Sequence, residues 1–242
     1  MPKLYLLDIE GTTSPVSFVY DVLFPYARKH MSDYIVHHSS DSLLQEDLRL
    51  LAHENAIDRS SGAPIIYYPQ PLSQDPAEAL QSSISYLLWL MDKDRKSTAL
   101  KSIQGKIWAE GYEKGELKSE VFADVPPALR RWHAVSRVAI YSSGSVEAQK
   151  YLFGYTTAGN LTPFIDAYFD TRTGPKIESA SYRKIADAMN VGTADIFFIS
   201  DSIRELDAAR NVGMATFLSL RPGNAAITDH HAHSAISSFD AL

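Results

Sequence analysis

The stretch Lys3-Leu-Tyr-Leu-Leu-Asp8-Ile-Glu10-Gly11-Thr12-Thr13 decides the fold of this chain. Its apolar run predicts a buried strand over residues 3–7, and that strand ends abruptly at the carboxylate of Asp8. Acidic residues are disfavoured in strands and in cores unless they are paired or bind a metal. In open α/β sheets, ligands bind just outside the carboxyl ends of the strands. We therefore expect Asp8 and Glu10 to lie at a binding site.

The composition of the 242-residue chain is that of a globular protein, with 45% hydrophobic and 21% charged residues. This length allows one large domain or two smaller ones. A net charge of -6 disfavours a general binder of nucleic acid or anionic membranes, and no apolar run has transmembrane length. The lack of cysteine excludes disulfides and a cysteine nucleophile and fits a reducing cytosol. The first residues lack the features of a signal peptide, so we expect none.

The middle of the chain is predicted to be helical. Apolar residues recur at helical spacing in residues 14–35, 41–56, 76–91 and 97–114. Asp75-Pro76 has the residue types of a helix start, an N-cap followed by proline at the first helical position. The intervening residues 58–76 predict a loop, with a short extended piece at 65–68.

After Pro126-Pro127, apolar runs alternate with helical patterns. The predicted strands cover residues 137–141, 165–169, 195–200 and 215–218, and the predicted helices cover 128–133, 146–153, 179–189 and 202–211. Such alternation predicts an α/β fold, a parallel sheet with helices on both faces. Because the strand at 3–7 joins this sheet, we expect one domain made of 1–16 and 124–242 and an inserted helical domain at 17–123.

Polar groups stand at a strand end or a helix start in four separate stretches. These are Asp8 with Glu10, Ser142 with Ser143, Lys176, and Asp201 with Ser202. Because parallel strands end at the same edge of a sheet, the four stretches are expected to converge on one site. Carboxylates suit Mg²⁺, serines at a helix N-terminus suit an anion, and the lysine adds a positive charge.

An aspartate nucleophile needs this set of neighbours. A carboxylate that attacks a phosphate ester brings two anions together, and Mg²⁺ with Lys176 offsets their repulsion. The covalent acyl-phosphate then splits hydrolysis into two steps. Glu10, two residues beyond Asp8, is positioned to protonate the leaving oxygen and then to activate the water.

These stretches resemble, in order, the four motifs of the haloacid dehalogenase superfamily of phosphatases. The helical block stands where that superfamily places a cap domain, and Glu10 stands where most members have Asp. A longer likeness points to one family of the superfamily, the enolase-phosphatases (acireductone synthases) of methionine salvage. It is carried by residues 7–19, 22–26, 107–112, 115–118, 141–150, 198–201 and 205–209, and it weakens at 57–75 and after Pro222.

The resemblance implies a Rossmann-like catalytic core with a cap that closes over the site. It implies that the family's substrate is 2,3-diketo-5-methylthiopentyl-1-phosphate, which is enolised and then dephosphorylated to the acireductone. It also implies a cytoplasmic monomer, with nuclear presence left open for a eukaryote. By position, Asp8 is the nucleophile, Asp8, Glu10 and Asp201 hold Mg²⁺, and Ser142, Ser143 and Lys176 bind the substrate phosphate. Glu10 is our candidate for moving the carbon-bound proton.

The site residues also have plain structural interpretations. These are a strand-end cap for Asp8, a solvated loop for Glu10, helix N-caps for Ser142, Ser143, Asp201 and Ser202, a surface position for Lys176, and a solvated face for Glu205. The functional interpretation of Glu205 is support of the residues that hold the metal. At the level of function, the alternatives are a generic sugar-phosphate phosphatase of the same superfamily and a non-catalytic binding module.

Two further groups of residues are weighed in the same way. Trp89, Trp108 and Tyr112 are expected in the core of the helical block, with contact to the methylthio chain as the alternative. Asp229-His230-His231 with His233 has the residue types of a metal site. Because it lies near the end of the chain without a framing element, we predict a loose solvated segment instead.

Overall fold

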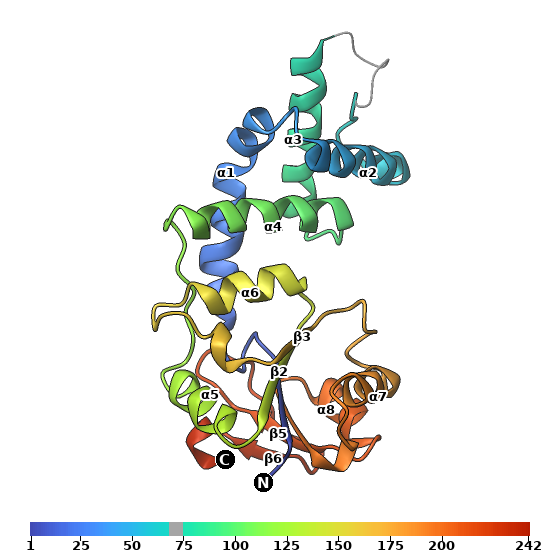
Figure 1. The fold of residues 1–242 in the computed structure, drawn as a ribbon. Helices are drawn as coiled ribbons and strands as arrows, with labels where there is room; N and C mark the ends of the chain where they lie inside the picture. Colours follow the sequence, from blue (N-terminus) through green and yellow to red (C-terminus); the bar gives the residue numbers. More distant parts are fainter. Residues whose placement is uncertain (68–74) are drawn as a thin grey trace. The chain divides into compact units, whose positions relative to one another are not determined.

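The structure, a computed structural model, describes residues 1–67 and 75–242 (Figure 1). It divides into two compact units. The core unit consists of Met1–Asp21 and Gly115–Leu242, and the helical unit consists of Val22–Lys114. The helical unit is shorter at both ends than the predicted segment 17–123, and its role as a cap stays a prediction.

The core unit is built on a six-stranded sheet in which every pair of neighbours is parallel, in the order β3-β2-β1-β4-β5-β6. The predicted α/β fold is therefore confirmed. The strands are β1 (Leu4–Leu7), β2 (Arg137–Tyr141), β3 (Ala167–Phe169), β4 (Ile196–Ser200), β5 (Ala215–Ser219) and β6 (Ser234–Ile236).

The register of the central strands brings the predicted site residues to one edge. β1 lies between β2 and β4, and all four of its residues are buried, as expected for a strand covered on both faces. Leu7 pairs with Ile140 of β2 and with Ile199 of β4. The three strands therefore end at nearly the same level, and the segments that follow them leave the sheet side by side.

Helices cover both faces of this sheet (Figure 1). One face, which includes Leu4 and Leu6, packs in one apolar cluster with residues of α7 and α8. On the other face, Tyr5 stacks on Trp132 of α5 with ring centroids 4.1 Å apart. The helices are α5 (Val125–His133), α6 (Val146–Gly154), α7 (Ser179–Ala188) and α8 (Ile203–Arg210), with the short turns η3 (Thr162–Phe164), η4 (Thr193–Asp195) and η5 (Phe239–Ala241).

The helical unit has an apolar core of its own, to which each of its described α-helices contributes. Trp89 and Trp108 pack against this core, so their predicted place in it is confirmed. Tyr112 of α4 is buried, as predicted for a core residue. Contact of these residues with a methylthio chain stays a prediction. The elements are α1 (Phe24–His37), α2 (Ser42–Asp58), η2 (Arg59–Ser61), α3 (Pro76–Asp92) and α4 (Thr98–Glu113).

The predicted start of α3 is confirmed, because the Asp75 side chain accepts a hydrogen bond from the Ala77 N–H at 2.8 Å. The predicted helix at 14–35 is confirmed from residue 16 onward, but its first part is not a regular α-helix. A π-helical segment, η1 (Phe18–Leu23), directly precedes α1, in which Pro25 occupies the first turn. A proline there removes an N–H that a continuous α-helix would use.

Other differences lie at the edges of the sheet and in the loop before α3. β6 is not predicted from the sequence, and β3 begins later than residue 165 because η3 precedes it. Of the extended piece predicted at 65–68, residues 65–67 form no strand, and Tyr68 lies outside the described residues.

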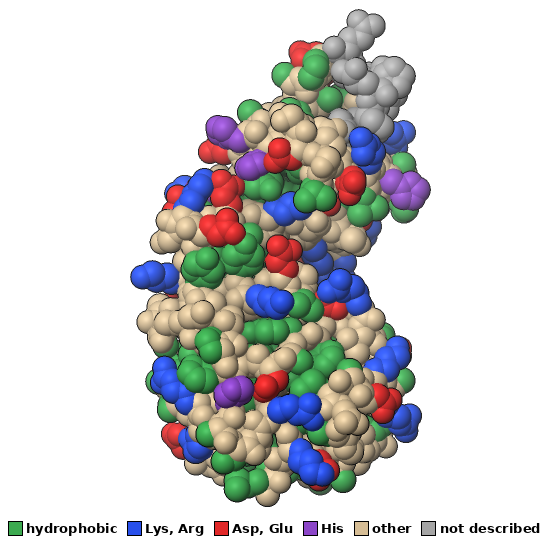
Figure 2. Space-filling view, in the orientation of Figure 1, with side chains coloured by type: hydrophobic (Ala, Val, Ile, Leu, Met, Phe, Trp, Pro, Cys, Tyr) green, Lys and Arg blue, Asp and Glu red, His purple; other side chains and the backbone are tan. Residues whose placement is uncertain are grey.

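Acidic and basic side chains are interspersed on the face that Figure 2 shows. Within 1–67 and 75–242, no helix combines the length and the apolar character needed to cross a bilayer.

Candidate active site

Asp8 lies immediately beyond β1, and it is 3% exposed. Its N–H continues the ladder by donating to the Ile199 carbonyl at 3.0 Å. The chain then folds into a tight turn over residues 9–14, in which the Ile9 carbonyl accepts from the N–H groups of Thr12, Thr13 and Ser14. Thr13 Oγ1 donates to the Asp8 carbonyl at 3.0 Å and so ties the turn to the strand end.

Lys176 makes the shortest contact with Asp8. Its Nζ lies 2.5 Å from Asp8 Oδ1 and 2.7 Å from Glu205 Oε2, and its side chain is only 10% exposed, so the surface interpretation of Lys176 is wrong. Burial by itself lowers the pKa of a lysine. The carboxylates of Asp8 and Glu205 nevertheless raise the pKa of Lys176 above its ordinary value, so the ammonium stays charged.

Two tyrosines position the loop that carries Lys176. Tyr182 of α7 donates its hydroxyl to the Lys176 carbonyl at 2.7 Å. Tyr141 at the end of β2 donates its hydroxyl to the Gly174 carbonyl at 2.8 Å, and its ring centroid lies 5.8 Å from Lys176 Nζ. The lysine therefore approaches Asp8 on a backbone that is held by hydrogen bonds from β2 and α7.

Ser200 contacts Asp8 and connects it to Glu205. Ser200 Oγ lies 3.0 Å from Asp8 Oδ2 and 3.1 Å from Glu205 Oε2. The predicted supporting role of Glu205 matches this placement, and its solvated alternative is wrong. Burial, and then the negative charge of Asp8, raises the pKa of Glu205 to about 7. Sequence reasoning missed Ser200, although its place as the last residue of β4 was a usable signal.

Asp201 approaches the turn at Gly11 very closely. Gly11 has φ +68°, and a Cβ added there would lie 2.3 Å from Asp201 Oδ2. Glycine is therefore required at this position for space as well as for its backbone conformation. Burial, and then Asp8, raises the pKa of Asp201 to about 7.

Glu10 follows Asp8 by two residues and lies beside Ser142. Burial, followed by the charge of Asp8, raises the pKa of Glu10 above its ordinary value. Ser142 Oγ lies 3.5 Å from Glu10 Oε2. A buried carboxyl with a raised pKa holds its proton to higher pH than an exposed glutamate does, which suits proton transfer.

Neither Ser142 nor Ser143 is the N-cap of α6. Ser145 occupies that position, and its hydroxyl accepts from the Ala148 N–H at 3.2 Å. Ser142 is buried and accepts from the Gly144 N–H at 3.2 Å, whereas Ser143 is exposed. The capping interpretation is wrong for both residues, and phosphate binding by them stays a prediction.

Ser202 occupies the N-cap position of α8, directly after Asp201. Its side chain makes no capping hydrogen bond, and its N–H donates to Ser200 Oγ at 3.1 Å. The capping interpretation of Asp201 is wrong, because the N-cap position belongs to the next residue.

The donor set has the charge and chemistry for a hard cation, although it is not a complete cage. No group of three or more His, Asp or Glu side chains within 1–67 and 75–242 has the arrangement of a metal site. Carboxylates of Asp8, Glu10 and Asp201 would therefore supply only part of a coordination shell. Mg²⁺ is commonly bound in this way, by one or two carboxylates together with water and phosphate.

The histidine tract near the end of the chain is not a loose segment at His233. His233 is 5% exposed, and its Nε2 lies 3.1 Å from Asp207 Oδ1 on α8. His231 Nδ1 lies 3.0 Å from Asp207 Oδ2. The prediction of a solvated segment is therefore wrong for His233, because the sequence does not reveal that α8 brings Asp207 beside it. The described residues form no metal cluster there.

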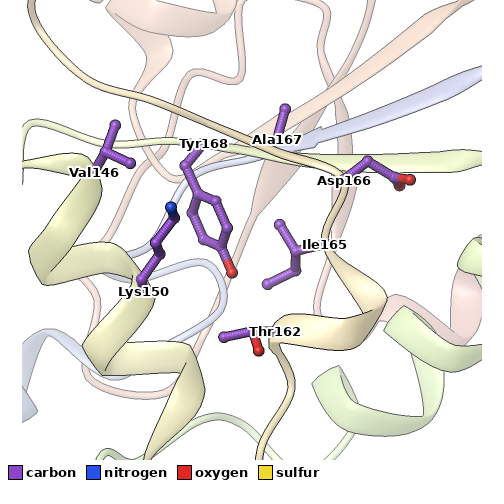
Figure 3. Close-up of a pocket in the computed structure, with 7 residues that line it drawn as sticks. All are labelled: Val146, Lys150, Thr162, Ile165, Asp166, Ala167 and Tyr168. Atoms are coloured by element: carbon purple, nitrogen blue, oxygen red, sulfur yellow. The ribbon is translucent and has the colours of Figure 1, made fainter.

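A cavity of about 580 Å³ lies beside the edge strand β3, and no predicted site residue lines it. Figure 3 shows Tyr168 between Lys150 of α6 and Ile165. Burial raises the pKa of Tyr168, which keeps its hydroxyl protonated. Lys150 is exposed, and none of the residues that surround Asp8 lines this cavity. The cavity therefore lacks the buried carboxylates and lysine found at the ends of β1 and β4.

Known proteins match this chain over nearly its whole length. The family model described as a haloacid dehalogenase-like hydrolase matches residues 2–213. Enolase-phosphatase E1 of Synechococcus elongatus is 49% identical over 238 residues, which cover 98% of this chain and 96% of that protein. The crystal structure of the UTR4 protein of Saccharomyces cerevisiae has a TM-score of 0.79 at 35% identity and covers 100% of both chains.

A plant relative is longer. The probable bifunctional methylthioribulose-1-phosphate dehydratase/enolase-phosphatase E1 of Sorghum bicolor is 41% identical over 242 residues. The match covers 99% of this chain but 47% of the plant protein. The present chain therefore corresponds to about half of that protein.

Proposed function

Because the chain belongs to the enolase-phosphatase E1 family of the haloacid dehalogenase-like hydrolases, we propose that it is a Mg²⁺-dependent enolase-phosphatase. Its proposed substrate is 2,3-diketo-5-methylthiopentyl-1-phosphate, and its products are the acireductone and phosphate. The observation that carries the proposal is the contact of Lys176 with Asp8 at the carboxyl end of the central strand. This contact places a fixed positive charge beside a carboxylate that faces the site.

The substrate is supported by the name of the plant relative. That name combines methylthioribulose-1-phosphate dehydratase with enolase-phosphatase E1 in one chain. Loss of water from methylthioribulose 1-phosphate leaves a phosphorylated diketone with a methylthio group. An enzyme that enolises and dephosphorylates this diketone would act directly after the dehydratase, which fits the association of both activities in one protein.

Enolisation is a proton shift within the substrate and needs no co-reactant. A carboxylate removes the proton from the carbon beside the carbonyl, and the carbonyl oxygen gains a proton as the C=C bond forms. Glu10 is the group we assign to this transfer, because its pKa is raised and it lies next to the nucleophile. Its protonated and ionised forms are then both populated closer to neutral pH than those of an exposed glutamate.

Dephosphorylation follows through Asp8. A carboxylate oxygen of Asp8 forms a bond to phosphorus while the bond from phosphorus to the substrate oxygen breaks, and protonated Glu10 gives its proton to that leaving oxygen. Water then attacks the acyl-phosphate, Glu10 accepts a proton from the water, and phosphate leaves with Asp8 restored. Lys176 offsets the negative charge on the phosphoryl oxygens, and Ser142 and Ser143 would donate hydrogen bonds to them.

The cation would be held by Asp8, Glu10 and Asp201. When bound, Mg²⁺ supplies charge neutralisation for the phosphate and a Lewis acid for the carbonyl oxygen of the diketone. The fit rests on the negative charge of these carboxylates. Among the described residues, Lys176 contacts Asp8 and Glu205, and its single positive charge does not neutralise all the carboxylates of the site.

The test of Asp8 is the Asp8→Asn variant. An amide oxygen is a poor nucleophile, so we expect phosphate release to fall by about 10⁴-fold or more. Asp187→Asn on the exposed surface of α7 is the matched control and should keep wild-type activity. Activity close to wild type in Asp8→Asn would exclude Asp8 as the nucleophile.

The coupled reaction is tested with a phosphorylated 1,2-diketone as substrate. An enol absorbance should rise before inorganic phosphate is released, and EDTA should abolish the release of phosphate. Release of phosphate without any enol would instead favour the generic sugar-phosphate phosphatase. We also propose that the protein is a monomer, whose mass light scattering would check. It would act on a small-molecule substrate in the cytoplasm and, in a eukaryote, also in the nucleus.

A further inference from the structure

The last residue of β5, Ser219, and the loop after it, residues 220–224, hold the turn that follows Asp8. Asn224 Nδ2 donates to the Gly11 carbonyl at 2.9 Å, and Ser219 Oγ donates to the same oxygen at 3.1 Å. Arg221 Nε donates to the Thr12 carbonyl at 3.1 Å. The backbone between Glu10 and Thr13 is therefore fixed by side chains that lie more than 200 residues later in the sequence.

The orientation of the Asn224 amide is set by its neighbours. Its Nδ2 faces the carbonyl oxygens of Gly11 and Ser219, at 2.9 and 3.3 Å, and a carbonyl oxygen can only accept. Oδ1 therefore faces the other way, where it is buried and accepts no hydrogen bond from the described residues. A buried acceptor without a donor costs about 1–3 kcal/mol, which favours a donor from outside the chain.

The unpartnered oxygen lies on the same side of Gly11 as the carboxylate of Asp201. A Cβ on Gly11 would lie 2.8 Å from Asn224 Oδ1 and 2.3 Å from Asp201 Oδ2, so the two oxygens flank the same face of Gly11. Both atoms carry negative partial or full charge. Such oxygens repel each other unless a donor or a cation lies between them.

We propose that Asn224 is a positioning residue of the cation site, whose amide oxygen accepts a hydrogen bond from a water in the hydration shell of the Mg²⁺ ion held by Asp201. The inference rests on the proposed function, because that function supplies the ion. Bound Mg²⁺ usually keeps several waters, and partners of the coordination shell orient it. A neutral amide does this without adding charge to a site that already contains Asp8, Glu10 and Asp201.

The test measures Mg²⁺ binding by calorimetry on the metal-free full chain, without substrate. Asn224→Ala should weaken Mg²⁺ binding by about 10- to 100-fold, the usual effect of losing an outer partner of a metal site. Ser219→Ala is the matched control, because it removes the other donor to the Gly11 carbonyl and leaves Asn224 Oδ1 in place. Its effect should stay below about 3-fold. Asn160→Ala, which loses only the exposed contact with Thr162, should bind like wild type.

Equal weakening in Asn224→Ala and Ser219→Ala would overturn the proposal, because Asn224 would then serve only the Gly11 carbonyl. Wild-type affinity in Asn224→Ala would overturn it as well. Circular dichroism establishes that each variant is folded. If Asn224→Ala is not, Asn224→Ser replaces it, because its hydroxyl keeps a donor on the side chain while the amide oxygen is lost; Mg²⁺ binding should again be weaker, and wild-type affinity is the contrary result. Failure of the wild type to bind Mg²⁺ would contradict the proposed function instead.

Discussion

Asp8 and Glu205 share two partners, Lys176 and Ser200, so Asp8 belongs to a network and not to a single ion pair. Lys176 lies between Asp8 and Glu205, and Ser200 Oγ lies within hydrogen-bond distance of the same two carboxylates. One hydroxyl hydrogen can serve only one of them at a time. A proton on Glu205 removes that conflict, because the carboxyl can then donate to Ser200 Oγ while the hydroxyl donates to Asp8.

The raised pKa values of Glu205 and Asp201, about 7 each, predict how stability depends on pH. In the unfolded chain these carboxyls titrate near pH 4. Between about pH 4 and pH 7 the folded state therefore binds more protons than the unfolded state, and stability falls as pH rises. We expect the melting temperature of the metal-free protein to fall from about pH 5 to about pH 8. The fall should be smaller in Glu205→Gln, which cannot ionise.

Thermal unfolding in EDTA, followed by circular dichroism across this range, checks the prediction. Glu147→Gln on the exposed first turn of α6 is the control and should reproduce the wild-type slope. Parallel curves for wild type and Glu205→Gln would contradict the assignment of the slope to Glu205. Added Mg²⁺ should reduce the slope in wild type, because a bound cation favours the ionised carboxylates.

At the scale of elements, the turn at residues 9–14 depends on Gly11 for two separate reasons. Gly11 has φ +68°, and its missing Cβ leaves room for Asp201. Gly62 has a similar φ of +76° but nothing within 4 Å of the place a Cβ would take. The two glycines therefore separate the cost of the backbone conformation from the cost of the clash.

Gly62→Ala should destabilise the protein by about 1–2 kcal/mol, the cost of the left-handed conformation for an ordinary residue. Gly11→Ala should cost more and should also lose nearly all phosphatase activity, because the new methyl group displaces Asp201. Urea denaturation and kcat of both variants are the measurements. A Gly11→Ala variant with normal kcat would show that the position of Asp201 is not needed for the reaction.

The elements that sequence patterns predicted are those with a strong local signal. The apolar runs of β1, β2, β4 and β5 and the cap at Asp75 are of this kind. β6 has no such signal, because Ser234 and Ala235 are exposed and only Ile236 is buried. The π-helical η1 looks like an ordinary helix in its spacing of apolar residues, and only the structure reveals its different hydrogen bonding.

The residues of the candidate site also divide into those with a local sequence signal and those without one. Asp8, Lys176 and Asp201 were predicted because each follows a strand or belongs to an ordered set of motifs, and the family they indicated is confirmed. Ser200 was missed because serine at a strand end has many ordinary explanations. Asn224 was missed because its contact with Gly11 joins distant parts of the chain. Such contacts depend on the tertiary fold, and no local pattern encodes them.

At the scale of the whole molecule, each unit has its own buried core, and the chain passes between them at Asp21/Val22 and Lys114/Gly115. Within the core unit, Arg221 connects the turn at residues 9–14 to the last residues of the chain, because it donates to the carbonyls of Thr12 and Ser237. Its guanidinium lies 4.6 Å from the ring centroids of both Phe122 and Phe239 and 2.8 Å from Asp124. The side chain is 4% exposed, so this ion pair is shielded from solvent. The last residues of the chain are thus held in the core unit by contacts within that unit.

Separate cores predict that damage to the helical unit leaves the unfolding of the core unit unchanged. Leu48 of α2 is 0% exposed in the helical core, so Leu48→Ala should cost about 2–5 kcal/mol. In a background with Trp89→Phe and Trp108→Phe, the remaining Trp132 reports on the core unit alone. The urea midpoint of Trp132 fluorescence should then stay constant, while the midpoint of the far-ultraviolet helical signal falls. If both midpoints fall together, the two units unfold as one cooperative body, and their separate cores do not confer separate stability.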